Sequence, residues 1–205
     1  MATEVLSAEG EAEITVSDAK QRVLDVAEQL FMERGYAAVT LRDIAGALGM
    51  RQASLYYHFP DGKEQLFVAM AERVFERHRH GMTQAIAGAG PDLAAQLDAV
   101  AHWFTSQPAV NFMGMMYADM PALSADRAGE LSQAAFAAMF EPLRHAFQAA
   151  YDRREIRYVH MNILAGSFLA LMDGVTFSAT QQRNVPRDIL SAEVIALLLD
   201  GLRPR

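Results

Sequence analysis

Hydrophobic residues recur every three to four positions along most of this chain, and no stretch shows the strict alternation typical of a strand. Pro142 falls inside one predicted helix and must kink it or start a new one, because proline has no backbone N–H to donate. The pattern predicts an all-α protein of about nine helices. The predicted helices cover residues 18–34, 41–48, 51–58, 61–80, 91–107, 125–154, 158–181 and 187–202, with a short apolar segment at 109–120.

Two of these helices are short and adjacent, and residues suited to caps and turns surround them. Thr40 is a suitable N-cap for the first helix, and Gly49 follows it where a helix commonly ends in a left-handed residue. The second helix directs Leu55 inward. Asp61 and Glu64 are then spaced as a capping box for the next helix. This order of elements predicts a helix-turn-helix.

The second short helix carries polar and aromatic side chains on its outward face. They are Arg51, Gln52, Ser54, Tyr56, Tyr57 and His58. Arginine pairs with guanine edges and glutamine with adenine edges in the major groove of DNA, whereas tyrosine and serine hydroxyls bond phosphates. The set therefore indicates a DNA-reading helix. The alternative is a small packing helix whose aromatic residues belong to the core.

The distribution of charge divides the chain into parts. The net charge of −7 argues against DNA binding, but residues 1–17 hold four Glu and no basic residue. Residues 18–80 hold nine basic and nine acidic residues, so we expect only a few phosphate contacts per subunit. We expect 1–17 to be a disordered acidic tail. The segment 18–65 is predicted to form a three-helix helix-turn-helix domain, and 66–205 a larger helical domain.

A longer run of residues extends this pattern on both sides. It consists of Ala27, Leu30, Phe31, Gly35, Tyr36, Val39, Thr40, Ile44, Ala45 and Gly49, then LYYHFP at 55–60, and Lys63, Glu64 and Leu66. Together these residues resemble the amino-terminal domain of TetR-family transcriptional regulators. That family commonly has one residue between the proline and the lysine. This chain has Asp61 and Gly62 there, and so resembles the subgroup with the loop FPGGKE.

The resemblance implies a homodimer that binds double-stranded DNA at a palindromic operator, with two recognition helices about one DNA turn apart. It implies contacts to base edges from Arg42, Gln52 and Tyr56, and contacts to phosphates from Thr40, Tyr57, His58 and Lys63. Arg51, Ala53 and Ser54 complete the expected DNA-binding set. The resemblance also implies that the larger domain, 66–205, binds a ligand and forms the dimer.

Small residues four positions apart mark one side of helix 158–181, and helix 187–202 is apolar on nearly all sides. Such features suit either close packing inside one chain or a four-helix dimer interface, and the resemblance implies the interface. The expected interface residues are Gly166, Ala170, Gly174, Ser178, Val194, Ile195 and Leu198.

Methionine and aromatic residues are dense in the middle of the chain, and they can line an adaptable apolar cavity or simply fill a core. The resemblance favours a cavity for a small, largely apolar effector. The expected ligand-binding residues are His102, Trp103, Phe104, Met113, Met116, Tyr117, Met120, Phe136, Met139, Phe140, Phe168, Met172, Asp173 and Phe177. Asn111 and Asn162 are further polar candidates for orienting a ligand.

Several other classes of protein fit the sequence less well. The chain has no cysteine, so no disulfide or thiol site is expected, and no glycine-rich phosphate loop or Ser-His-Asp arrangement indicates an enzyme. His78 and His80 point in different directions on a helix, so we expect no metal site, and we expect no cofactor. No apolar run reaches the ~18 residues of a membrane span and no secretory signal is visible, so a soluble cytoplasmic protein is expected.

The resulting interpretation is a repressor that an effector releases from DNA by moving helix 61–80, which joins the two domains. A ligand shifts such an equilibrium only by its different affinities for the two states. The alternatives are an activator of the same fold and a helical small-molecule carrier that does not bind specific DNA.

Overall fold

The computed structural model describes residues 2–108, 112–181 and 185–204, with the backbone alone for 2–17, 113, 180 and 181. Every regular element in these ranges is helical, which confirms the all-α prediction. The elements are α1 (Ala2–Ala38), α2 (Leu41–Ala47), α3 (Gln52–His58), α4 (Lys63–Gly88), α5 (Leu93–Ser106), α6 (Phe112–Gly114), the π-helical η1 (Met115–Asp119), the 3-10 turn η2 (Met120–Ala122), α7 (Ala125–Ala135), the π-helical η3 (Phe136–Phe140), α8 (Glu141–Asp152), α9 (Met161–Gln181) and α10 (Arg187–Leu202).

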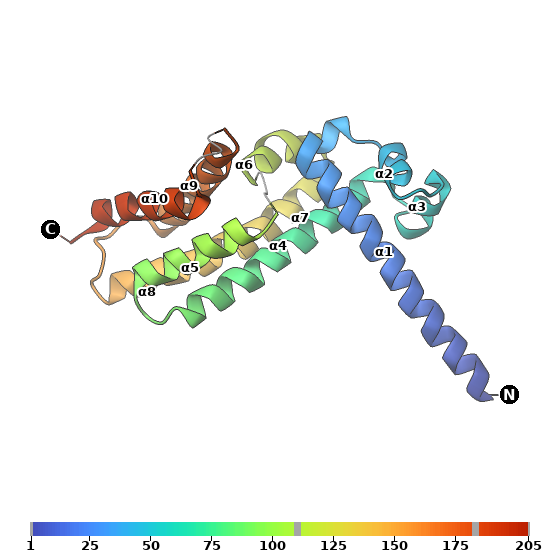
Figure 1. The fold of residues 1–205 in the computed structure, drawn as a ribbon, viewed down its shortest axis with the longest axis horizontal. Helices are drawn as coiled ribbons and strands as arrows, with labels where there is room; N and C mark the ends of the chain where they lie inside the picture. The colour runs from blue at the N-terminus through green and yellow to red at the C-terminus, as the bar shows by residue number, and fades with distance from the viewer. Residues whose placement is uncertain (1, 109–111, 182–184, 205) are drawn as a thin grey trace.

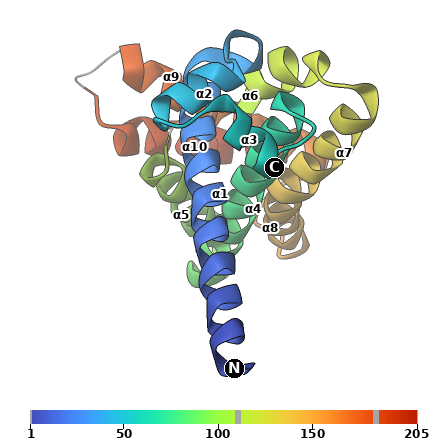
Figure 2. The same ribbon diagram turned by 90° about the vertical axis from the view of Figure 1, so that its right-hand side faces the viewer.

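The helices form two groups joined by α4, as Figure 1 shows. At one end α2 and α3 lie against α1, and α1 lies against α4. Along its length α4 also contacts α5, α7, η3 and α8. At the opposite end α10 contacts α5 and α9, so the last two helices form the outer edge of the larger group. Figure 2 views the molecule from the end that carries α2 and α3.

The first helix differs from the prediction at its start. Residues 1–17 were expected to be a disordered tail, whereas the backbone of 2–17 continues α1 as a helix that projects from the rest of the chain (Figure 1). The expected stop at Gly35 is confirmed, because this residue has φ 77° and ψ 163° and interrupts the helical backbone. Only glycine adopts such a conformation without steric cost.

The prediction that the fourth helix ends near residue 80 is wrong, because α4 continues to Gly88. The basic cluster before residue 80 suggested a helix C-terminus, but the inward apolar stripe resumes beyond it. Gly81 and Met82 are both buried against the rest of the bundle. Burial of these next positions stabilises the helix beyond the charged residues.

Pro142 does not interrupt the predicted helix, because helical backbone continues from α7 through the π-helical turn η3 into α8. Pro142 lies directly after η3. The π-helical turn changes the backbone hydrogen-bond register at the point where proline supplies no N–H donor. A π-helical turn contains one residue more than an α-helical turn. The other π-helical turn, η1, likewise comes shortly before a proline, Pro121.

An ion-pair cluster fixes α1 on α4. The carboxylate of Glu28 is buried and accepts hydrogen bonds from Arg73 at 2.8 Å and from Arg77 at 2.6 and 3.1 Å. Arg73 also reaches Asp25 at 2.6 Å. Burial alone would raise the pKa of Glu28, but the two guanidinium groups outweigh burial and lower it. The helix-turn-helix group is therefore held to α4 by a charged, oriented contact.

A second close contact joins α4 to α5. The indole ring of Trp103 lies directly on the backbone of Gly81, so that a Cβ built on Gly81 would overlap the ring. The ring also donates a hydrogen bond from Nε1 to Nδ1 of His78 at 3.3 Å. A residue without a side chain at position 81 is thus required for this approach.

We expect Gly81→Ala to lower the free energy of unfolding by about 1–3 kcal/mol, the usual effect of overpacking a filled core. The new methyl group must displace the Trp103 ring, so the intrinsic fluorescence of this single tryptophan should also shift. Urea unfolding monitored by circular dichroism measures the stability.

Gly88→Ala is the matched control, because nothing lies within 4 Å of a Cβ at Gly88 in the same helix. There the substitution should be neutral or stabilising. Equal stability of the two variants would contradict the close contact at Gly81.

Candidate functional site

The helix-turn-helix is built from a capped short helix and a tight turn. The Thr40 hydroxyl accepts a hydrogen bond from the Asp43 N–H at 3.2 Å, and the Thr40 N–H donates to the Asp43 carboxylate at 2.8 Å. This reciprocal capping box confirms Thr40 as the N-cap of α2 and lowers the pKa of Asp43 through its hydrogen bonds to Thr40. Gly49 has φ 66°, as expected for the turn into α3.

The side chains of α3 are almost entirely available to a partner. Leu55 alone is buried, while Tyr56 and Tyr57 are 46% and 76% exposed. The remaining expected contact residues on this helix and its flanks are also exposed, namely Arg42, Arg51, Gln52, Ala53 and Ser54. The half-buried His58 ring meets the edge of Tyr57 at 5.1 Å between ring centroids. The structure thus brings these residues together on one short helix and its immediate surroundings.

Lys63 lies differently from the other expected DNA contacts. Its ammonium group sits over the ring of Tyr36, 4.2 Å from the centroid, and the side chain is half-buried. Burial lowers the pKa of Lys63, and the nearby Asp119 carboxylate opposes that shift. This position favours a role inside the protein, at the joint between the two helix groups.

That joint contains three hydrogen bonds that the sequence pattern did not predict. The backbone N–H of Tyr36, at the end of α1, donates to Oδ1 of Asp119 on η1 at 2.8 Å. The backbone N–H of Ser124 donates to Oε1 of Glu64 at 3.2 Å, and the Ser124 hydroxyl donates to the same oxygen. The predicted capping box of Asp61 and Glu64 is therefore wrong. Gly62, with φ 79°, is the N-cap of α4, and Glu64 bonds the segment before α7 instead.

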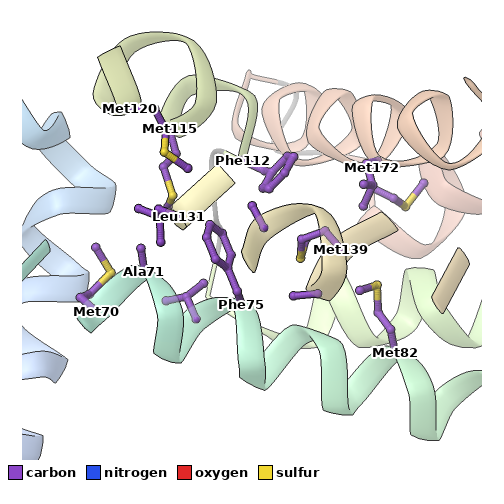
Figure 3. Packing of buried hydrophobic residues seen from close by; sticks show 14 of the residues in the cluster. Met70, Ala71, Phe75, Met82, Phe112, Met115, Met120, Leu131, Met139 and Met172 are labelled. Carbon is purple, nitrogen blue, oxygen red and sulfur yellow. The ribbon is translucent and has the colours of Figure 1, made fainter. Parts of the chain in front are cut away.

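A small cavity lies inside the larger group of helices. Its volume is about 20 Å³, close to the size of one water molecule. The residues that line it are His78, Phe104, Pro108, Phe112, Met139, Leu169, Met172, Asp173 and Thr176. Figure 3 shows Phe112, Met139 and Met172 between α4 and α9. Four of the expected ligand-binding residues, Phe104, Met139, Met172 and Asp173, line this cavity.

The other expected ligand-binding residues lie elsewhere. Exposed positions are His102, Tyr117, Phe136 and Phe177, and Asn162 is exposed as well. Four others, Met116, Met120, Phe140 and Phe168, lie in or against the hydrophobic core without lining the cavity. Trp103 does not line the cavity either, but it donates a hydrogen bond to His78, which does. Asn111 and the side chain of Met113 lie outside the described residues. Periodicity alone could not separate these groups, because aromatic residues in this region occupy buried and exposed faces alike.

His78 is one of the lining residues that the sequence did not predict. Its position on the buried stripe of α4, with Val74, Phe75 and Met82, was the available signal. The side chain is 1% exposed, and its ring stacks on Phe104 with 5.2 Å between centroids. Burial, assisted by the positive charge of Arg77, lowers the pKa of His78 to about 4.

In the described part of the chain, no three acidic or histidine side chains are placed to hold a metal ion.

The expected interface residues on α9 and α10 do not all face the same way. Gly166 lies against the ring of Phe140 in the same chain, whereas Ala170 and Gly174 are exposed. A row spaced four residues apart drifts around a helix of 3.6 residues per turn, which explains the divergence. Ile195 is buried within its own chain, while Ser178, Val194 and Leu198 are half-buried. Larger apolar side chains are exposed on these two helices: Ile163, Leu171, Phe177, Ile189 and Leu197.

Comparison with known proteins decides the family of the helix-turn-helix. Residues 23–70 match the family model described as "Bacterial regulatory proteins, tetR family". The helix-turn-helix segment is of the TetR family. The matched residues include α2, α3 and the start of α4, so the exposed face of α3 lies within the part of the chain that defines the TetR family.

Two curated relatives share this TetR-family segment. The transcriptional repressor KstR2 of Rhodococcus jostii is 42% identical over 84 residues, which cover 41% of this chain and 40% of KstR2. The negative transcriptional regulator IcaR of Staphylococcus epidermidis is 41% identical over 56 residues, which cover 27% of this chain and 30% of IcaR. The similarity thus spans less than half the length of either relative.

Solved structures extend the likeness of fold to most of the chain. The fatty acid degradation regulator FadR from Bacillus halodurans superposes with a TM-score of 0.71 at 17% identity, covering 91% of this chain and 97% of FadR. A tetR-family regulatory protein from Rhodococcus RHA1 superposes with a TM-score of 0.70 at 20% identity, covering 91% and 98%. At such low identity the agreement establishes the TetR-family fold of both helix groups.

We expect acidification to destabilise the protein through His78. With a folded pKa of about 4 and an ordinary value of 6.5, the unfolded chain binds a proton between these pH values that the folded chain does not. The stability is therefore complete above pH 6.5 and declines as the pH falls towards 4. Between pH 7 and pH 5 the free energy of unfolding should fall by about 2 kcal/mol on this account.

Urea unfolding at the two pH values, for the wild type and for His78→Phe, measures this contribution. The variant should lose that part of the pH dependence, whereas His80→Phe, at an exposed position two residues later, should keep it. The same pH dependence of the free energy of unfolding in all three proteins would show that folding does not lower the pKa of His78.

Proposed function

We propose that this TetR-family protein is a transcriptional regulator that binds a palindromic DNA operator as a homodimer. The exposed face of α3 carries this proposal. A short helix with one buried residue and a cluster of exposed tyrosine, glutamine and arginine side chains matches what major-groove reading requires. The capped α2 holds α3 in place, and the exposed Arg42 and Arg51 supply positive charge beside it.

We assign contacts to base edges to Arg42, Gln52 and Tyr56. Contacts to phosphates are assigned to Tyr57, His58 and Thr40, the N-cap of α2. Arg51, Ala53 and Ser54 complete the surface. Few cations flank it, so non-specific affinity is expected to be modest and to fall only gradually with rising salt. The names of KstR2, a repressor, and IcaR, a negative regulator, favour repression as the direction of control.

Dimerisation is proposed through α9 and α10. The stretch Met161–Ala179 of α9 is long and apolar enough to cross a membrane, with a mean hydropathy of 1.3, yet only 33% of it is buried within the chain. One side of α9 packs against α5, α6, η3, α8 and α10, so this helix is part of a globular bundle. We therefore assign its uncovered apolar side chains to an interface with a second copy of the chain. A two-fold axis would bring the same surface of each copy together.

Release from DNA is proposed to follow binding of a small, largely apolar effector in the larger group of helices. Consecutive elements of the chain connect the cavity with the joint, which supports an effect of ligand binding on the helix-turn-helix. Phe112 of α6 lines the cavity, and η1, which follows α6 directly, carries the Asp119 that bonds the end of α1. A ligand that displaces Phe112 would thus act on the helix-turn-helix through Asp119 as well as through α4.

The proposed function is tested by selecting binding sites from a random DNA pool at a stated salt concentration. Enrichment of a palindrome is expected, and a reporter gene behind that site would then give the direction of control. We expect Tyr56→Ala to weaken binding to the selected site by about 1–3 kcal/mol, because it removes a contact to a base edge.

Tyr158→Ala is the matched control, since Tyr158 is 64% exposed but lies before α9, far along the chain from α3. Circular dichroism and sedimentation should show that both variants fold and assemble as the wild type does. Operator affinity that is unchanged in Tyr56→Ala would remove this residue from the reading surface. No enrichment by a folded dimer across a range of salt would contradict the regulator itself.

We expect Leu197→Glu to convert the dimer into monomers at micromolar concentration. Leu197 is 74% exposed on α10, and a charge buried between two copies has no partner there. Analytical ultracentrifugation measures the change, and operator affinity should fall with it.

Tyr117→Glu is the control, because it places the same charge at a position on η1 that is 75% exposed and should leave the dimer intact. A dimeric Leu197→Glu protein would place the interface elsewhere.

A further inference from the structure

The hydrogen bond between Trp103 and His78 fixes the proton on the histidine ring. An indole N–H can only donate, so Nδ1 of His78, which lies 3.3 Å from Nε1 of Trp103, must be the acceptor. The ring is neutral near pH 7, because burial lowers its pKa to about 4. A neutral imidazole with an accepting Nδ1 carries its proton on Nε2. His78 therefore offers one N–H donor, at Nε2.

This donor is held in place, and no described part of the chain satisfies it. Nε2 of His78 is buried and has no hydrogen-bond partner among the described residues. The ring cannot turn freely, since it stacks on Phe104 and its other nitrogen is engaged by Trp103, which itself rests on Gly81. Leaving a buried donor unsatisfied is unfavourable, so its retention calls for an acceptor.

The walls of the adjoining cavity restrict the kind of acceptor. Phe104, Phe112, Met139, Leu169 and Met172 make it largely apolar, and no Lys or Arg is among the described residues of its lining. Asp173 contributes a carboxyl group to the same lining. An anionic ligand would be desolvated beside that carboxyl group without a cation to pair with, which is unfavourable. An uncharged oxygen acceptor avoids this cost.

The cavity can enlarge to take a ligand. Its present volume of about 20 Å³ suits one water molecule, but two of its walls are the unbranched side chains Met139 and Met172. Methionine has three rotatable side-chain bonds and adapts to differently shaped apolar partners. Thr176 on the same wall already donates its hydroxyl to the Met172 carbonyl at 3.1 Å, so it does not compete with His78 as a donor.

We propose that the effector binds in this cavity and is an uncharged, largely apolar molecule whose carbonyl oxygen accepts a hydrogen bond from Nε2 of His78. This inference rests on the proposed effector-controlled function and adds the chemical class of the effector. A carboxylic acid of the same skeleton is excluded by the lining, and a hydrocarbon of the same skeleton lacks the acceptor.

The tautomer is tested first, by long-range ¹H–¹⁵N correlation NMR of the ligand-free wild type, with His78→Gln used to assign the signals. A neutral ring protonated at Nε2 is expected at pH 7. Protonation at Nδ1, or a charged ring, would overturn the proposal, because the donor would then be absent or differently placed.

Binding is tested with three probes of similar size: cyclohexanone, methylcyclohexane and cyclohexanecarboxylate. The chain has a single tryptophan, Trp103, and it contacts His78, so its fluorescence reports binding at this site directly. We expect cyclohexanone to bind about tenfold more tightly than either other probe, the effect of one hydrogen bond to a buried donor.

Three variants separate the donor from the shape of the site. His78→Phe should lose the preference for the ketone, whereas His78→Gln, which retains an amide N–H, should keep most of it. His80→Phe, exposed on the same helix, should behave as the wild type. A ketone preference that persists in His78→Phe, equal binding of the three probes, tighter binding of the carboxylate, or binding of none of them would each overturn the proposal.

The final measurement adds cyclohexanone to the wild-type complex with its selected operator. Ketone binding with release of DNA supports both proposals. Specific DNA binding by a protein that binds no ketone would overturn the cavity assignment and leave the regulator in place. Ketone binding by a protein that selects no DNA would overturn the regulator and leave the cavity assignment standing as that of a carrier.

Discussion

Both helix groups of this molecule are built around α4, and this sharing constrains everything else in the structure. Near its start, Phe67 meets the ring of Phe31 edge-on at 5.2 Å, which places α4 in the core of the helix-turn-helix group. Further along, His78 contacts Trp103 and Phe104 of α5. A single helix of 26 residues therefore connects the two groups over about 39 Å.

The two groups are coupled by directional contacts rather than by apolar packing alone. Glu28 binds Arg73 and Arg77 across α1 and α4, and Asp119 binds the backbone of Tyr36 across the joint. Hydrogen bonds and ion pairs of this kind fix an orientation, whereas apolar surfaces tolerate sliding. The proposed control of DNA binding depends on this difference, because a reading helix must keep its register in the groove.

The polar groups buried in the larger group serve a different purpose from those at the joint. His78 is held by stacking and by one hydrogen bond, it lines a largely apolar cavity, and its Nε2 has no partner among the described residues. An isolated donor among methionine and aromatic side chains gives little stability, but in the proposed ligand site it would distinguish ligands that differ in a single oxygen. Stability and recognition are thus separated within one fold, with the charged contacts near α1 and the selective contact near α5.

The sequence by itself determined the helical class, the cap at Thr40, the turn at Gly49 and the outward residues of α3, because these depend on local spacing and on backbone preferences within a few residues. Only the tertiary structure decided that α4 continues past its basic cluster, that Glu64 bonds Ser124, and that His102 and Tyr117 face solvent while His78 lines the cavity. These outcomes depend on which distant side chains meet. A helical repeat specifies faces, but it does not specify the partner that covers each face.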